Sequence, residues 1–554
     1  LAGINPITTQ IYTTGRFSGG SNYVDTLSNL LQVPQYNFAI GGASTTGNGT
    51  AGLPGFPFEV QEFLSGGGTL GFPSVTTTLT RSDLVAISIG GNDSRYYQQG
   101  GGTVAGAPAA AAAAVNSFQQ NFSLVMQKGT PTISFLAGNA ALLPEVATNP
   151  SAQAVRAAFS NAYNSGAQQV LAGYARQGSI VHYLDLTQLA GDITANPAAY
   201  GIVGTVCPAI PDPTCIANSN APYLFYVDDL HLTSAGFAIV GEYVVRQLAA
   251  PLTLQAPSDM ELDVARQWGR TLSSRSDLYG RGKLANGIRF YALGDAVQHD
   301  LPQSDTNSAF SVRSAGVTLG AEWAMGGGMV GIAGNYSRPK VSFGNDAARI
   351  RGHSWQVGAY GSLSAAGLFG QAYAGYGSDH DRIERAGVVD DMVARPSGSH
   401  AVAGAKGGYL VQAGPLGIGP MIALDYARAR VDAYTETGDP ALTLNVSRQS
   451  LKAFTGQAGV EVRSEVAGFH PFLDATVERN FTGNDQLITF DQTDSPIIVN
   501  SWAIRRPTET YGRISGGTRA ELFSGFSIDA FVSSTVGRKR GQEVGGNIGV
   551  SARF

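Results

Sequence analysis

The sequence has few charged residues, no long apolar run and no excess of positive charge, and each shortage excludes a class of protein. Charged residues make up 14% of the 554 residues, well below the share of about 25% that is usual in soluble domains. No run of about 18 consecutive apolar residues occurs, which excludes a helical membrane span. The net charge of −5 argues against a nucleic-acid partner held by phosphate contacts.

Cysteine and histidine are also scarce. The two cysteines, Cys207 and Cys215, enclose PAIPDPT, a spacing unlike the CxxC pairs of zinc sites, and no histidine clusters beside them. We predict a disulfide across this short loop, formed in an oxidising compartment, with two free thiols as the alternative. Because no set of metal ligands is visible in the sequence, we expect neither a metal site nor a cofactor.

Glycine is in excess, at 72 of the 554 residues, which is close to twice the usual share of about 7%. The hydrophobic content of 43% excludes disorder caused by the lack of a core. Low charge and abundant glycine without a spanning helix are compatible with a closed β-barrel, in which residues facing lipid alternate with residues facing the lumen.

The first 250 residues alternate short apolar runs with helix-forming stretches. Strands are predicted at 84–91, 132–138 and 179–186, and helices at 107–129 and 151–177. Strands that alternate with helices of this length predict βαβ units and a layered α/β domain with a parallel sheet.

From about residue 285 onward, apolar and polar residues alternate with a period of two. The last twelve residues, EVGGNIGVSARF, place Val544, Ile548 and Val550 on one face and Glu543, Asn547 and Ser551 on the other. About twelve such segments fit between 285 and 554, with about 22 residues for each strand and its connection. This arithmetic predicts a twelve-stranded transmembrane antiparallel barrel, with a large soluble β-domain such as a sandwich as the alternative.

Between the two halves, residues 257–280 predict a polar helix. Ser258 and Glu261 have the spacing of a capping box, which predicts the start of the helix there. Most faces of the helix are polar, and it carries Arg266, Arg270 and Arg275. Such a helix suits the polar lumen of a barrel better than the underside of a hydrophobic sheet. A solvated linker helix is the alternative.

The first half contains two histidines, and they differ in their surroundings. His182 lies inside the apolar run SIVHYLDL, which is typical of a structural histidine. His231 lies in YVDDLHLTSAGF, with Asp228 three residues before it. At this spacing the carboxylate can hold one imidazole nitrogen and leave the other to act as a base. A DxxH motif alone is weak evidence, because it is common by chance.

Two glycine-containing segments could supply donors for an oxyanion. SIGGNDS places the amide of Asn92 at the end of a predicted strand, and NFAIGGAST ends an apolar run with Gly42. Ligands bind at the carboxyl edge of open α/β sheets. A side-chain amide and a backbone N–H that converge there would stabilise a developing oxyanion in acyl transfer, whereas each segment taken alone is also ordinary turn chemistry.

In this order, NFAIGGA, GGND and DDLH resemble the conserved blocks of the GDSL (SGNH) family of serine esterases and lipases. With the alternating half attached, the chain is similar to autotransporter esterases, in which an SGNH passenger stays fused to a twelve-stranded translocator. The terminal Phe554 matches the outer-membrane assembly signature. The resemblance implies hydrolysis of carboxylic esters, with Gly42 and Asn92 as oxyanion donors and Asp228 and His231 as the acid–base pair.

One part of the family pattern is absent from the sequence. The family's nucleophile is the serine of a Gly-Asp-Ser-Leu block, and no such block occurs here. It is expected just before GRFSGG, so we expect it upstream of Leu1 rather than lost from an inactive form. Ser94 belongs to the asparagine block, and Ser18 and Ser21 have no supporting motif, so none of these three serines is a good substitute.

The sequence therefore predicts three segments. They are an SGNH-type esterase passenger at 1–255, a linker helix in the barrel lumen at 256–284 and an autotransporter barrel at 285–554. We expect a monomer in the bacterial outer membrane that displays its passenger at the cell surface. Its expected partners are an ester or lipid substrate, outer-membrane lipid and the barrel-assembly machinery. The alternatives are a non-catalytic adhesin passenger and a channel whose N-terminal half is a plug.

Overall fold

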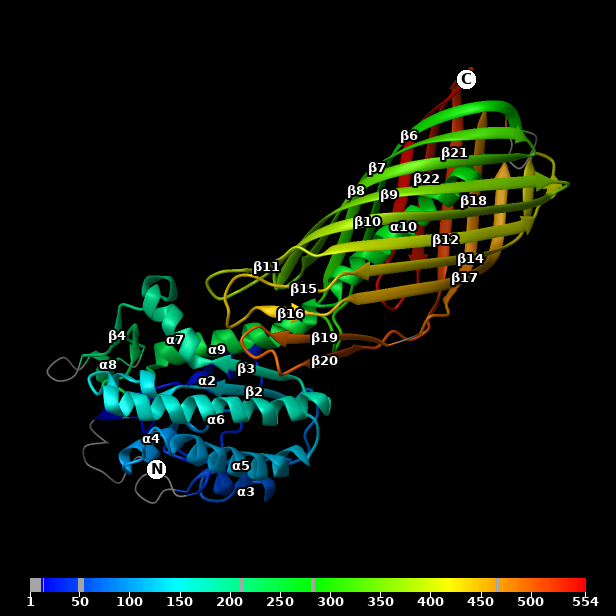
Figure 1. The fold of residues 1–554 in the computed structure, drawn as a ribbon. Coiled ribbons are helices and arrows are strands. Elements are labelled where there is room, and N and C mark those ends of the chain that lie inside the picture. The colour runs from blue at the N-terminus through cyan, green and yellow to red at the C-terminus, as the bar shows by residue number, and fades with distance from the viewer. Residues whose placement is uncertain are drawn as a thin grey trace.

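The computed structural model describes residues 11–12, 14–47, 54–208, 214–218, 220–279, 284–464, 466, 468–483 and 485–554. They form an N-terminal α/β domain and a C-terminal β-barrel, and the chain ends at the end of the barrel that is far from the α/β domain (Figure 1). The predicted fold class, an α/β domain followed by a helix and a twelve-stranded barrel, is confirmed.

A parallel three-stranded sheet forms the centre of the α/β domain. Strand β2 (Thr132–Ala137) lies between β1 (Leu84–Ile87) and β3 (Val181–Asp185). The helices are α2 (Tyr23–Leu31), α3 (Phe56–Leu64), α4 (Gly91–Gln99), α5 (Ala107–Met126), α6 (Pro150–Arg176), α7 (Leu186–Ala195), α8 (Thr214–Ala217) and α9 (Ser234–Ala249). The shorter elements are β4 (Gly204–Val206), β5 (Tyr223–Phe225) and the 3-10 turns η2 (Ala140–Leu142), η3 (Pro144–Val146) and η4 (Pro197–Tyr200).

Helices cover both faces of this sheet. Helices α3, α5 and α6 share one hydrophobic core with it, and α2, α7 and α9 share another. Successive residues of a strand point to opposite faces, so Tyr183 enters the first core and Leu184 the second. None of the helices in the described residues is both long and apolar enough to cross a bilayer.

Strand β1 is shorter than the predicted segment 84–91, because the chain turns into α4 after Ile87. Gly90 precedes the helix with φ +102°, a conformation that glycine adopts without strain. A Cβ at Gly90 would lie 2.1 Å from the Tyr163 ring. Glycine at this position therefore allows both the turn and the close packing of α4 on α6.

Twelve of the described strands close into an antiparallel barrel, in which β23 pairs with β6. They are β6 (Leu284–Leu301), β7 (Phe310–Gly326), β8 (Gly328–Phe343), β9 (Ala348–Ala365), β10 (Leu368–Arg385), β12 (Ser397–Tyr409), β14 (Leu416–Val431), β17 (Gln449–Ser464), β18 (Phe469–Asn480), β21 (Thr510–Phe523), β22 (Phe526–Val536) and β23 (Glu543–Arg553). Two short strands, β11 (Met392–Ala394) and β13 (Val411–Ala413), lengthen the sheet at its ends.

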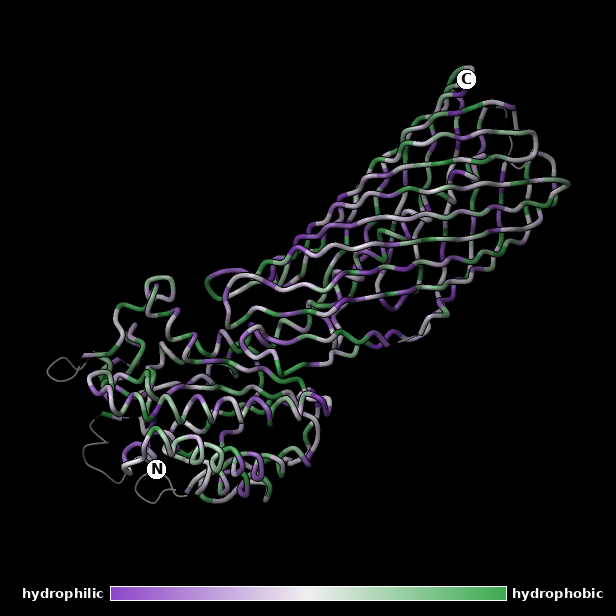
Figure 2. The backbone as a smooth tube through the Cα atoms, viewed as in Figure 1, coloured by the Kyte–Doolittle hydropathy of each residue, from purple (hydrophilic) through white to green (hydrophobic). Residues whose placement is uncertain are grey.

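Alternation along the strands gives the barrel an apolar outside and a polar lumen. On β9, Trp355 and Val357 are 65% and 63% exposed, whereas Ser354 and Gln356 between and beside them are 0% and 5% exposed. Figure 2 shows hydrophobic and hydrophilic residues interleaved along the barrel strands. This is the arrangement of a barrel whose outer face contacts lipid.

Helix α10 (Ala256–Leu278) follows the turn η5 (Ala250–Thr253) and runs inside the barrel (Figure 1). Its residues are buried except Arg266, Arg270 and Ser273, which are partly exposed. The capping box predicted at Ser258 is wrong. The helix begins earlier because Gln255 already has helical φ and ψ, and the Ser258 hydroxyl donates to the Gln255 carbonyl instead of accepting an N–H.

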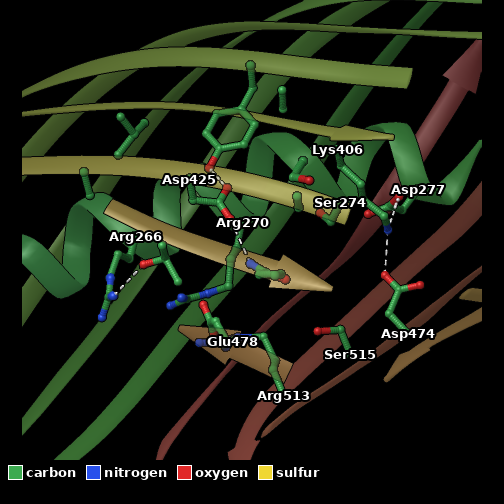
Figure 3. Close-up of a pocket in the computed structure, with 18 of the residues that line it drawn as sticks. Arg266, Arg270, Ser274, Asp277, Lys406, Asp425, Asp474, Glu478, Arg513 and Ser515 are labelled. Atoms are coloured by element: carbon green, nitrogen blue, oxygen red, sulfur yellow. Dashed lines mark hydrogen bonds and ion pairs between the residues drawn. The ribbon is translucent and has the colours of Figure 1, made fainter. Parts of the chain in front are cut away.

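Ion pairs that exclude water hold α10 against the barrel wall. Arg275 donates to Glu322 of β7 and to Asp529 of β22, each at 2.7 Å, and all three side chains are 0% exposed. Further along the lumen, Lys406 of β12 lies between Asp277 of α10 and Asp474 of β18, at 3.0 and 2.6 Å (Figure 3). These pairs fix both the rotation and the depth of the helix.

At the end of the barrel nearest the α/β domain, loops between the barrel strands contact that domain. They form a sheet of β15 (Tyr434–Thr435), β16 (Leu444–Val446), β19 (Gln486–Gln492) and β20 (Asn500–Ile504). The Asn500 side chain accepts the Val181 N–H at 2.8 Å and donates to the Val181 carbonyl at 3.0 Å. Gln492 does the same to Tyr183, at 2.7 and 2.8 Å. Two side-chain amides thus take the place of a neighbouring strand along β3.

Replacing Arg275 with methionine should destabilise the barrel by about 3–5 kcal/mol, because Glu322 and Asp529 would remain buried without their cation. Heat unfolding of the detergent-purified protein, followed by circular dichroism, measures the change. Arg382→Met is the matched control, since its pair with Glu384 is exposed to solvent and should contribute about 0–1 kcal/mol. Equal unfolding temperatures for the two variants would contradict the prediction.

Candidate active site

Three loops bring the predicted site residues to one region of the α/β domain. Asn92 lies in the first turn of α4, directly after β1. Gly42 lies in the loop before α3, and the loop from β5 to α9 carries Asp228 and His231. The carboxyl ends of parallel strands are where open α/β sheets bind ligands, so the fold places polar groups at a suitable edge.

Asp228 and His231 form a hydrogen-bonded pair. Asp228 Oδ2 lies 2.6 Å from His231 Nδ1, and Asp228 Oδ1 accepts the N–H groups of Leu230 and His231, each at 3.0 Å. The Tyr226 N–H donates to the His231 carbonyl at 2.7 Å and closes the turn. The DxxH segment therefore builds its own geometry, with the carboxylate supporting both the turn and the imidazole.

The electrostatics of the pair suit a general base. Burial raises the pKa of Asp228, but the hydrogen bonds and charge of His231 outweigh burial and hold that pKa below its usual range. Since an ionised carboxylate only accepts hydrogen bonds, His231 Nδ1 carries the proton and Nε2 keeps a free lone pair. The His231 side chain is 29% exposed, so it remains accessible to a reactant.

Two aromatic side chains complete the surroundings of the pair. The Tyr12 hydroxyl donates to Asp228 Oδ2. Burial and the Asp228 carboxylate raise the pKa of Tyr12, so the hydroxyl stays protonated and acts as a donor. The ring of Phe17 stacks on His231, with centroids 4.4 Å apart. Tyr12 lies 216 residues from Asp228 in sequence, and no motif or spacing marks it as part of the site.

The two predicted oxyanion donors are close neighbours. The Asn92 side-chain amide donates to the Ala43 carbonyl at 2.9 Å, and the Tyr96 hydroxyl donates to the Gly42 carbonyl at 2.8 Å. Gly42 has φ +86°. Its N–H makes no hydrogen bond within the described part of the chain. One of the two N–H groups of the Asn92 amide serves Ala43, and the other is available to a ligand.

Phe17 lies between these donors and the acid–base pair. Its ring stacks on His231 on one side, and a Cβ at Gly41 would lie 2.0 Å from the same ring. The loop that carries Gly42 and the loop that carries His231 are therefore separated by a single aromatic ring. Glycine at position 41 is what permits this close approach.

Helix α4 is tied to both loops. Asp93 accepts the Thr45 N–H at 3.0 Å and the Thr45 hydroxyl at 2.5 Å. Arg95 pairs with Glu145 at 2.8 Å, and the Glu145 N–H donates to the Asp229 carbonyl at 3.0 Å. Asn92 is thus held by its neighbours in a fixed position relative to both Gly42 and His231.

Other residues considered from the sequence lie elsewhere. His182 is buried in β3, where burial, with Arg385 as a second cause, lowers the pKa of His182 to about 4 and keeps the side chain neutral. The hydroxyls of Ser18 and Ser94 are buried and donate to backbone carbonyls. Ser21 is exposed. None of these three serines contacts His231 within the described residues.

Cys207 and Cys215 are joined by a disulfide with Cα atoms 6.2 Å apart. Both are buried and share a small hydrophobic cluster with Tyr12 and Tyr226. The disulfide therefore supports the aromatic residues behind the acid–base pair.

Two family models match the chain. Residues 3–244 match the GDSL-like Lipase/Acylhydrolase family, and residues 294–533 match the Autotransporter beta-domain. The chain thus combines a GDSL-like domain with an autotransporter β-domain. This family assignment confirms the predicted location of the barrel in the bacterial outer membrane, with the passenger exposed at the cell surface.

The autotransporter is 23% identical over 420 residues to Esterase EstA of Pseudomonas aeruginosa, and the same holds for Esterase EstA of Pseudomonas putida. Each match covers 70% of this chain and 64% of the relative, so the chain spans slightly less than two thirds of the relatives' length.

Two solved structures are similar to the barrel half. The translocator domain of the autotransporter NalP from Neisseria meningitidis gives a TM-score of 0.45 at 21% identity, covering 54% of this chain and 98% of that chain. The transport unit of the autotransporter AIDA-I from Escherichia coli gives a TM-score of 0.36 at 16% identity, covering 53% and 99%.

The half-buried carboxyl group of Glu59 supports the loop that carries Gly42. Glu59 of α3 accepts the Ile40 N–H at 2.6 Å. Burial raises the pKa of Glu59 to about 7, and the hydrogen bond from Ile40 opposes this shift only in part. A group whose pKa is raised on folding contributes most to stability below its ordinary pKa of 4.5, and the contribution is lost as the pH rises to about 7.

Glu59→Gln keeps an oxygen that can accept the Ile40 N–H and removes the titration. The variant should gain stability relative to the natural protein at pH 8, where Glu59 must be buried in its charged form, and much less at pH 5. Thermal unfolding of the passenger at the two pH values measures this gain. Glu62→Gln, at a partly exposed position of the same helix, is the control. An equal gain at pH 5 and pH 8 would contradict the raised pKa.

Proposed function

We propose that residues 1–255 hydrolyse carboxylic esters by a serine acyl-enzyme route. The observation that carries the proposal is the Asp228–His231 pair, whose Nε2 keeps its lone pair and is separated by the Phe17 ring from the loop of Gly42, which Asn92 contacts. The GDSL-like family model over residues 3–244 and the esterases among the relatives support the same activity.

In the proposed reaction, His231 Nε2 takes the proton of a serine hydroxyl as the oxygen attacks the ester carbonyl carbon. The tetrahedral intermediate carries a negative oxygen, which accepts hydrogen bonds from the Gly42 N–H and the Asn92 amide. His231 then gives its proton to the leaving alcohol, and water releases the acid from the acyl-enzyme by the same two steps. Asp228 stays ionised and stabilises the imidazolium. The route uses neither a metal nor another cofactor.

The proposed nucleophile is the serine of the Gly-Asp-Ser-Leu block, which in the family precedes the segment that GRFSGG resembles. Ser18 and Ser94 are poor alternatives because their hydroxyls are buried and already donate to carbonyl groups. Ser21 is exposed, but no interaction links it to His231 among the described residues.

We further propose that the three segments have separate roles. Residues 1–255 act as the esterase passenger, 256–284 as a helix that anchors it within the lumen, and 285–554 as the translocator. The outer face of the barrel contacts outer-membrane lipid, and the barrel-assembly machinery inserts it. The substrate is an ester or a lipid, and the protein acts as a monomer without nucleic acid.

The two alternatives fit the observations less well. A purely adhesive passenger gives no reason for an ionised Asp228 that holds His231 in one tautomer. A solute channel is disfavoured because α10 occupies the lumen and is fixed there by buried ion pairs such as that of Arg275.

His231→Ala and Asp228→Asn should each lower kcat for a short-chain aryl ester by about 10³–10⁴-fold, because the first removes the base and the second favours the wrong tautomer. Hydrolysis by outer membranes with matched amounts of folded protein measures the loss. His353→Ala replaces an exposed histidine of the barrel and is the control. Activity that survives both site variants would refute the proposed mechanism.

A fluorophosphonate probe identifies the nucleophile directly. On the full-length protein, peptide mapping should find the label on the serine of a Gly-Asp-Ser-Leu block, and His231→Ala should abolish labelling because the hydroxyl is no longer activated. A label on Ser18, Ser21 or Ser94, or one insensitive to His231→Ala, would contradict the assignment.

Asn92→Ala should lower kcat by about 10²–10³-fold with little change in KM, because an oxyanion donor acts mainly in the transition state. Steady-state kinetics separate the two parameters. Asn164→Ala is a matched control, since its amide also donates to a backbone carbonyl, that of Gly138, at 3.1 Å. A change in KM alone would show that Asn92 serves only in binding.

A further inference from the structure

Three carboxyl groups meet inside the barrel where α10 passes β10. Glu261 comes from α10, and Asp379 and Asp381 are alternate residues of β10, so both point into the lumen. The Glu261 carboxyl lies against the other two, and the exposed fractions of the three side chains are 0%, 1% and 6%. Buried carboxylates repel one another strongly, so the arrangement requires either a bound cation or shared protons.

The oxygens of this cluster have few hydrogen bonds. Both carboxylate oxygens of Glu261 and one oxygen each of Asp379 and Asp381 lack a hydrogen-bond partner among the described residues. So does the hydroxyl of Ser354, which pairs with Asp379 across β9 and β10 and is fully buried. Five buried oxygens from α10, β9 and β10 are thus left without partners at one place.

His400 of β12 contacts the cluster. Its Nδ1 lies 2.8 Å from Asp379 Oδ2, and its Nε2 lies 3.0 Å from Gln356 Oε1. The orientation of Gln356 is fixed, because its Nε2 donates to Asn335 Oδ1 at 2.9 Å, and Asn335 in turn donates to Asp295. Both nitrogens of His400 therefore contact side-chain oxygens, and the ring holds Asp379 in place.

Within the described part of the chain, the carboxyl groups of the cluster lack a cationic side chain. With all three ionised, the cluster carries three negative charges. Among the ion pairs of the described residues, no lysine or arginine reaches Glu261, Asp379 or Asp381. Both ring nitrogens of His400 are already engaged by the side chains of Asp379 and Gln356, so His400 acts here to position Asp379.

A second cluster in the same lumen shows how arginine can satisfy such a group. Asp263 and Glu543 lie with His299 in a similar arrangement. Glu543, however, pairs with Arg270 at 2.8 Å, Arg538 at 3.1 Å and Arg513 at 3.3 Å. The protein thus provides guanidinium groups for one cluster and leaves oxygens without partners in the other.

We propose that Glu261, Asp379 and Asp381 bind a hard divalent cation, Ca²⁺ or Mg²⁺, that links α10 to the barrel wall. Donor atoms of Glu261 and Asp379 lie within 4.8 Å of each other, and the Asp381 carboxyl lies against Glu261. Ligand oxygens placed about 2.3–2.6 Å around Ca²⁺ are at most about 5 Å apart, so the spacing of Glu261 and Asp379 fits. Carboxylate and hydroxyl oxygens are the donors that such cations prefer, and the cation's two positive charges offset most of the negative charge of the cluster.

The site lies near the mouth of the barrel that faces the passenger. Arg385, four residues after Asp381, donates to the Leu442 carbonyl, and Leu442 belongs to a core shared with the passenger. A cation at Glu261 therefore fastens α10 close to the point where the passenger chain enters the lumen. The expectation from sequence that the chain has no metal site arose because these ligands lie far apart along the chain.

The test uses the full-length protein purified in detergent, stripped with EDTA and dialysed. Titration calorimetry with CaCl₂ and with MgCl₂ should show about one bound cation per chain, and the cation should raise the temperature at which the barrel unfolds. Glu261→Gln and Asp381→Asn should each abolish both effects. Either variant relieves charge repulsion, so each should fold without the cation. Glu384→Gln, a partly exposed site on β10, should retain both effects.

Three results would overturn the proposal. One is that neither cation binds and EDTA leaves the unfolding temperature unchanged, which would mean that shared protons neutralise the cluster. Another is that binding persists in Glu261→Gln and Asp381→Asn. The third is that Zn²⁺ binds while Ca²⁺ and Mg²⁺ do not, which would make His400 a ligand. Unfolding is measured without any ester substrate, so these outcomes are independent of the proposed esterase activity.

Discussion

The structure depends on the matching of charges between a polar helix and the wall that surrounds it. Taking a charged side chain out of water costs several kcal/mol unless an opposite charge meets it. Arg275 meets Glu322 and Asp529, and at the other end of the helix Asp259 meets Arg506 at 2.7 Å. Pairs of this kind contribute little net stability, but they favour one rotation and one depth of the helix over all others. The position of the passenger above the barrel follows from that choice.

Similar matching of charges and hydrogen bonds organises the Asp228–His231 pair. The Asp228 carboxylate accepts hydrogen bonds from the backbone, from His231 and from Tyr12, so it is satisfied while ionised. Donors and acceptors that are already oriented need no rearrangement when charge develops, and this is the main source of electrostatic catalysis. The hydrogen bond from Thr45 to Asp93 and the ion pair of Arg95 with Glu145 hold the start of α4, and with it Asn92, in a fixed position.

Local patterns in the sequence predict much of this architecture. Period-two alternation gives the barrel, since lipid on one side and a polar lumen on the other select for it in every strand. The motif DxxH predicts the hydrogen-bonded pair of Asp228 and His231 because its geometry is completed within one turn. Contacts between segments far apart in the chain produce no local sequence pattern, so they could not be predicted. The hydrogen bonds from Tyr12 to Asp228 and from Val181 to Asn500 span 216 and 319 residues. The capping box at Ser258 failed because the chain is already helical at Gln255, whose carbonyl accepts the Asp259 N–H and the Ser258 hydroxyl.

The pairing of β3 with Asn500 and Gln492 has a consequence for the use of such barrels to display foreign proteins. An unpaired strand edge is a template for association with other chains. A passenger cut away from its barrel would bare the backbone of Val181 and Tyr183 and become prone to aggregate. A barrel fused to an unrelated passenger would in turn expose the side-chain amides of Asn500 and Gln492, which here bond to the backbone of β3. In this protein the cargo and its carrier are fitted to each other, so exchange of one calls for redesign of the loops that meet it.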